Sequence, residues 1–69
     1  MRTVSGKKMC KVLEMRGWLL LRVTGSHHVY WHPLTKRQAV VPVHTNADLK
    51  PGTQRKIMRD AGLKDGELE

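Results

Sequence analysis

The sequence has few of the residues that cross-link a small domain or insert into a membrane. Its 69 residues include one cysteine, Cys10, which excludes an internal disulfide framework and favours a reducing compartment. The most apolar run, "WLLLRV", is interrupted by Arg22, whereas a membrane-spanning helix needs about 20 apolar residues. We therefore expect a cytoplasmic protein with one small hydrophobic core, because a chain this short buries only about 60% of its unfolded surface.

Acidic residues are also scarce and unevenly placed. Six Asp and Glu stand against thirteen Lys and Arg, for a net charge of +7, and Glu14 is the only acidic residue before Asp48. Such an excess of positive charge attracts polyanions, so the composition predicts a polyanionic partner without distinguishing nucleic acid from an acidic protein. The scarcity of carboxylates argues against a two-metal nuclease.

The segments at the two ends of the chain predict helices. Residues 5–16 place apolar side chains on one face, between a possible Ser5 cap and Gly17. A second helix is predicted to begin near Pro51 and to end at Gly62, because proline suits the first turn and glycine the C-terminal cap. On both helices the opposite face is basic.

Three short segments between the helices predict strands. They are residues 18–24, 27–32 and 38–43, and they are rich in strand-forming residues. Short connections favour an antiparallel meander, and Pro42 places the third strand at an edge or ends it there. The order α-β-β-β-α predicts a two-layer α+β sandwich, a three-stranded antiparallel sheet with two helices on one face. We expect a single domain over residues 1–69, with an ordered core of about 5–63 and a frayed tail over 64–69.

Three of the four histidines lie in "RVTGSHHVYWHP", residues 22–33. Alternation along a strand puts His27 and Trp31 on one face and His28 and Tyr30 on the other, but it does not say which face the helices cover. Neighbouring strand residues point in opposite directions, and the chain has no Cys-x-x-Cys or His-Glu-x-x-His motif. We therefore expect no metal site.

Three blocks of the sequence resemble the HicA toxins of prokaryotic type II toxin–antitoxin systems. They are "GWLLLRVTGSHHVYWHP", "VVPVH" and "LKPGTQRKIMRDAGL", and the resemblance extends from about Ser5 to Leu63. It implies a double-stranded-RNA-binding-domain-like fold and a metal-independent, cofactor-free endoribonuclease that cleaves mRNA. It also implies inhibition by a HicB antitoxin, so that the toxin is a monomer when free and part of a hetero-oligomer with its antitoxin. The family's catalytic histidine directly follows Gly-Ser, which indicates His27, with His28 as the alternative.

A single histidine can start RNA cleavage, because RNA carries its own nucleophile, the 2′-OH. An imidazole with an ordinary pKa of about 6.5 can accept that proton, which would produce a 2′,3′-cyclic phosphate and a 5′-OH end; hydrolysis by an activated water is the other route. A second group must stabilise the phosphorane or protonate the leaving oxygen, and the candidates include the Gly25–Ser26 backbone, the Ser26 hydroxyl, Arg22 and Lys36.

A fold of this type binds RNA through helix ends, a hairpin loop and a basic helix face. The predicted RNA-binding residues are Lys7, Lys8, Lys11, Arg22, Gly25, Ser26, Lys36, Arg37 and Lys50.

Other interpretations of the same residues stay open at this point. A non-catalytic RNA-binding module of the same fold would use the same basic residues, and a degenerate toxin would survive as a small interaction protein. One of the basic stripes can face the antitoxin instead of RNA. For His32 we expect a packing contact or a turn hydrogen bond. For His44 we expect a structural role, with a contact in the phosphate groove as the alternative.

Overall fold

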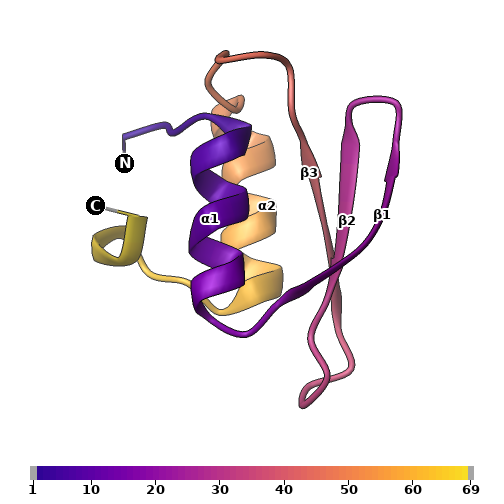
Figure 1. Ribbon diagram of the computed structural model, residues 1–69. Helices are drawn as coiled ribbons and strands as arrows, with labels where there is room; N and C mark the ends of the chain where they lie inside the picture. The colour runs from indigo at the N-terminus through magenta and orange to yellow at the C-terminus, as the bar shows by residue number, and fades with distance from the viewer. Residues whose placement is uncertain (1, 69) are drawn as a thin grey trace.

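The computed structural model describes residues 2–68 and consists of a three-stranded sheet with two helices packed on one side (Figure 1). The elements are α1 (Gly6–Met15), β1 (Leu19–Thr24), β2 (His27–Trp31), β3 (Gln38–Pro42), α2 (Pro51–Ala61) and the short 3-10 helix η1 (Asp65–Leu68). The predicted α-β-β-β-α order and the α+β class are confirmed. None of the described helices is long and apolar enough to cross a membrane.

The sheet is an antiparallel meander with the spatial order β1-β2-β3. Strand β3 lies at an edge and ends at Pro42, as the proline predicts. Strand β1 forms the other edge, and its pairing with β2 shifts register between Leu20 and Arg22, which makes Leu21 the extra residue of a β-bulge. Both helices lie on the same side of this sheet, so its other face is free of helices (Figure 1).

Helix α1 begins and ends where its capping residues predict. The Ser5 side chain accepts a hydrogen bond from the Lys8 N–H at 3.1 Å, and Gly17 takes a left-handed conformation with φ +90° just after the helix. Gly6, the first helical residue, passes so close to β3 that a Cβ atom there would collide with the Pro42 carbonyl oxygen. A side chain at this position would therefore push α1 away from the sheet.

Helix α2 ends in the predicted C-terminal glycine cap. Gly62 has φ +69°, and the Leu63 N–H donates to the Met58 carbonyl at 2.8 Å, which lets Leu63 fold back against the core. The buried Gln54 ties the N-terminal segment to this helix. Its Oε1 accepts from the Val4 N–H and its Nε2 donates to the Arg2 carbonyl, both at 2.8 Å.

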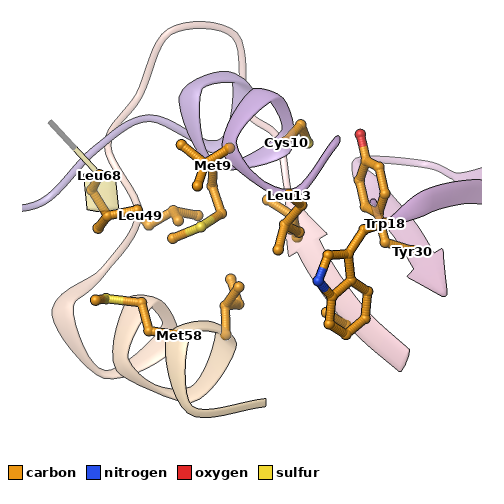
Figure 2. Close-up of a cluster of buried hydrophobic side chains, with 12 residues drawn as sticks. Met9, Cys10, Leu13, Trp18, Tyr30, Leu49, Met58 and Leu68 are labelled. Carbon is orange, nitrogen blue, oxygen red and sulfur yellow. The ribbon is translucent and has the colours of Figure 1, made fainter. Parts of the chain in front are cut away.

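The core lies between the two helices and the helix-facing side of the sheet (Figure 2). Its buried members are Met9, Cys10, Val12, Leu13, Trp18, Tyr30, Ala39, Val41, Leu49, Ile57, Met58 and Leu68. Every helix and strand except β1 contributes to this list, because all six residues of β1 remain exposed. The core is therefore displaced toward β3.

The C-terminal segment differs from the frayed tail expected over residues 64–69. Residues 65–68 form η1, whose Leu68 is 5% exposed and packs in the core. The Glu67 carboxylate also lies 3.2 Å from the Arg16 guanidinium. Residue 69 lies outside the described residues. Burial of one leucine at the open end of a small core, together with this ion pair, opposes the entropy cost of ordering the segment.

Candidate functional site

The sheet register determines which of the two neighbouring histidines faces solvent. Tyr30 is 1% exposed and belongs to the core cluster, whereas Val29 does not. Because side chains alternate along a strand, His28 shares the helix-facing side with Tyr30, and His27 shares the helix-free side with Trp31. His27 is exposed at the first position of β2, beside the β1–β2 turn.

The surroundings of His27 come from all three strands and the start of both helices. His27 is in register with Thr24 on β1 and Pro42 on β3, and the Val43 N–H donates to the Ser26 carbonyl at 2.7 Å. The N-terminal ends of both helices lie at the same end of the molecule as the β1–β2 turn (Figure 1). Helix N-termini carry partial positive charge, and here both point to the end of the molecule that holds the β1–β2 turn.

A second histidine, which follows the end of β3, reaches the same turn. His44 Nε2 lies 3.5 Å from the Ser26 hydroxyl oxygen, and the His44 side chain lines a surface pocket together with Lys50. Sequence reasoning assigned His44 a structural role, because the contact joins residues 18 positions apart. The available signal was "VPVH", residues 41–44: β3 ends at Pro42 within this stretch, beside the start of β2, and His44 follows two residues later.

The helix-free face continues from His27 toward the other end of β2. Arg22 and Val40 are in register on either side of Val29. Farther along, the Lys36 ammonium lies 5.2 Å from the centre of the Trp31 ring, a cation–π contact. The face thus offers a cation, a half-buried aromatic ring and an exposed imidazole on one side of the sheet. We call it the open face.

The structure separates the predicted RNA-binding residues into different surfaces. Arg22 and Lys36 lie on the open face, Gly25 and Ser26 form the turn beside His27, and Lys50 lies beyond His44. Lys7 and Lys11 instead line a groove with His28 on the helix-facing side, Lys8 is exposed on α1, and Arg37 lines a separate pocket with His32. The nine residues therefore do not form one site.

His32 has the structural role that its position before Pro33 predicts. Its Nε2 donates to the Arg16 carbonyl at 3.1 Å, and its Nδ1 accepts from the Leu34 N–H at 3.2 Å. The ring also packs edge-on against Trp18, with 5.3 Å between centroids. Both nitrogens are occupied, which leaves this imidazole no proton-transfer role.

The buried polar groups beneath the helices are poorly suited to nucleophilic chemistry. Burial raises the pKa of the Cys10 thiol, so little reactive thiolate is present at neutral pH. Burial, with hydrogen bonds to Cys10 and Glu14, also raises the pKa of Tyr30. The Tyr30 hydroxyl donates to the Glu14 carboxylate at 2.6 Å. Within residues 2–68 no three His, Cys, Asp or Glu side chains converge in a way that could hold a metal ion.

The family of the chain follows from comparison of its sequence with known protein families. A sequence profile for the HicA toxin of bacterial toxin–antitoxin systems matches residues 6–63. The chain belongs to the HicA toxin family. The match runs from the first residue of α1 through all three strands to Leu63, just after the α2 cap. Membership in the HicA family makes the chain the toxin of a toxin–antitoxin pair and implies a cognate antitoxin. A search of curated protein sequences returns no match.

Proposed function

We propose that this HicA-family toxin is a metal-independent endoribonuclease that cleaves mRNA, with His27 as the general base. The observation that carries the proposal is the position of His27, which is exposed on the helix-free side of the sheet, at the end of the molecule where both helices begin. His28, its neighbour, lines a groove on the opposite side. An RNA strand on the open face would meet the first imidazole and not the second.

The cleavage step needs one base, one acid and a group that stabilises the phosphorane. His27 removes the proton from the ribose 2′-OH, the 2′ oxygen bonds to phosphorus, and the bond from phosphorus to the 5′ oxygen breaks. The leaving 5′ oxygen then takes a proton, for which protonated His44 is the candidate because of its contact with Ser26. The products are a 2′,3′-cyclic phosphate and a 5′-OH end. The Ser26 hydroxyl and Arg22 are candidates to stabilise the negative charge.

The open face supports binding of single-stranded RNA next to this site. Trp31 shares the face with His27 and presents a ring on which an unpaired base can stack, with Lys36 close by. From His27 to Trp31 the strand spans about 13 Å at roughly 3.3 Å per residue, a length that suits two or three nucleotides. Phosphates would be held by Arg22 beside Val29, by Lys36 near Trp31, and by Lys50 near His44.

The remaining parts of the proposal concern the cellular setting. The antitoxin is of the HicB type, the toxin is a monomer when free and part of a hetero-oligomer when inhibited, and the pair acts in the cytoplasm. No cofactor enters the reaction. Support comes from family membership and from the strong positive charge of the chain, to which an acidic inhibitor is complementary.

End-group analysis of cleaved mRNA tests the proposed chemistry. Purified protein is incubated with an mRNA in the presence of EDTA, and the fragment ends are analysed. We expect fragments that carry 2′,3′-cyclic phosphate and 5′-OH ends. Fragments with 3′-OH ends, or cleavage that EDTA abolishes, would contradict the histidine mechanism. RNA binding without fragments at any protein concentration would instead favour the non-catalytic RNA-binding module.

A further inference from the structure

A groove lies between α1 and the helix-facing side of the β1–β2 hairpin. It has a volume of about 440 Å³ and is lined by Lys7, Cys10, Lys11, Glu14, Leu20, His28, Tyr30 and Val43. We call it the α1–β1 groove. It lies on the opposite side of the sheet from His27, and nothing in the proposed cleavage mechanism uses it.

Two apolar side chains of β1 are exposed beside the groove, although they point to the side of the sheet on which the helices pack. Leu20 and Val23 are in register with Tyr30 and His28 on the helix-facing side, yet they are 46% and 52% exposed. The core is displaced toward β3, so the helices do not cover this part of β1. Exposed apolar surface rimmed by polar residues is typical of protein interaction sites.

The charge around the groove limits what can occupy it. Lys7 and Lys11 are exposed on α1 at its rim. The one acidic residue of the lining, Glu14, already accepts the hydrogen bond from Tyr30. The rim is therefore cationic, while Leu20, the Tyr30 ring and Val43 give the floor its apolar character. An occupant that complements both parts carries apolar side chains on one side and carboxylates on the other.

A second copy of this chain does not meet that description. Among residues 2–68, four of the five acidic side chains are engaged: Glu14, Asp48, Asp60 and Glu67 contact Tyr30, Thr3, Lys56 and Arg16 respectively. The fifth, Asp65 on η1, is a single exposed carboxylate and does not form an acidic amphipathic segment. Association of two chains of net charge +7 would also place like charges together at the cationic rim. RNA is a poor fit for the opposite reason, since an apolar floor offers few partners for phosphates and sugars.

We propose that the α1–β1 groove is the docking site for an acidic, amphipathic segment of the cognate antitoxin. Its apolar side chains pack on Leu20 and Val43, and its carboxylates pair with Lys7 and Lys11. The identity of the partner rests on the toxin function. Under this assignment the two faces of the hairpin serve different partners, with RNA on the open face and antitoxin on the helix-facing side.

Two matched strand variants test the assignment. Leu20→Asp introduces a charge into the groove, and Val40→Asp introduces the same charge on the open face, where the native side chain is 44% exposed, nearly the 46% of Leu20. The probe is the purified antitoxin encoded by the reading frame next to the toxin gene, and affinity is measured by calorimetry. We expect Leu20→Asp to weaken binding at least about 30-fold, the scale of an interface hot spot, and Val40→Asp to change it less than about 3-fold. Equal losses, or a loss for Val40→Asp alone, would overturn the proposal.

A charge-reversal pair keeps the test valid if Leu20→Asp does not fold. Lys11→Glu and Lys64→Glu change the net charge equally, and both lysines are exposed. Only Lys11→Glu is expected to weaken the antitoxin complex, by about 10-fold at low salt, and to lose much of that effect at high salt. Equal weakening by the two variants would show a general charge effect and would overturn the docking site.

RNA cleavage by the same proteins separates this proposal from the proposed function. We expect Leu20→Asp to cleave mRNA like the wild type when antitoxin is absent. If neither protein cleaves, the ribonuclease proposal fails, while the affinity comparison still decides the docking site. If Leu20→Asp loses RNA binding but keeps its antitoxin affinity, the groove serves RNA and the docking proposal is wrong. Dimerisation of the free wild type that Leu20→Asp abolishes would likewise overturn it.

Discussion

The two sides of the β1–β2 hairpin differ in what covers them, and this difference assigns opposite properties to neighbouring residues. On the helix-facing side, Tyr30 is buried and His28 lines a groove with α1. On the open face, His27 and Trp31 have no helix above them (Figure 1). Two adjacent, chemically identical imidazoles therefore differ in the partners they can meet. In this fold packing, more than residue type, determines which histidine is available for chemistry.

The largest expected effect comes from exchanging the two histidines for alanine in turn. His27→Ala should lower the rate of mRNA cleavage about 10²- to 10⁴-fold, the usual contribution of a general base. His28→Ala should leave the rate within about 3-fold of wild type, because His28 lies on the other side of the sheet. Single-turnover cleavage at saturating protein measures both rates.

Folding must be compared alongside the rates. Both variants should melt within a few degrees of the wild type, since His27 is exposed and His28 half-buried. A full rate for His27→Ala together with a loss for His28→Ala would transfer the catalytic role to the helix-facing side. The contrast between the two faces would then be reversed.

Two glycines test how closely the helix layer approaches the sheet. Gly6→Ala should destabilise the protein by about 1–3 kcal/mol, the usual cost of overpacking, because the added Cβ would collide with the Pro42 carbonyl oxygen. Gly52→Ala, in the first turn of α2, has open space around it and should be neutral or stabilising by up to about 1 kcal/mol. Urea denaturation of both variants measures the difference. Equal stabilities would contradict the close contact between α1 and β3.

The two tryptophans extend the comparison to RNA binding. Trp31→Ala should weaken binding of a short single-stranded RNA by about 1–2 kcal/mol, as loss of one stacked base does, with little change in stability. Trp18 is buried in the core, and Trp18→Ala should unfold so small a protein, since such truncations cost about 3–5 kcal/mol. Fluorescence anisotropy with labelled RNA measures the first effect. An unchanged RNA affinity in Trp31→Ala would contradict RNA binding at the open face.

The helices were predictable to within about one residue because their signals are local. Ser5, Gly17 and Gly62 cap or terminate helices through bonds to residues a few positions away. The faces of the sheet were not predictable in this way. Val29 and Tyr30 are both apolar and adjacent, and only the position of the helices shows that Tyr30 belongs to the core.

Other features of the molecule were not predicted from the sequence, because they depend on contacts between segments that are distant along the chain. The proximity of His44 to Ser26 depends on β3 ending beside the start of β2. Leu68 packs in the core through the position of η1 against α1, which no local pattern of the polar C-terminal residues indicates. The exposure of Leu20 and Val23 likewise follows from where the helices stop covering the sheet.

The smallest expected effect concerns the polar contact on the helix-facing side. Tyr30→Phe removes the hydroxyl that donates to Glu14 and should cost about 1 kcal/mol at pH 7. Burial raises the pKa of Tyr30 above its ordinary value of 10.0, so the folded protein keeps the phenol proton at pH values where the unfolded chain loses it. The stabilisation is therefore complete below pH 10 and declines as the pH rises above 10. Thermal melts of the two proteins should differ most at neutral pH and converge at alkaline pH, where the lysines titrate equally in both.

A difference in melting temperature that widens above pH 10 would mean that the phenol is not held neutral by its surroundings. Because Tyr30 faces the helices, cleavage of mRNA should be the same in both proteins, and a large loss would show that the two faces do not act independently.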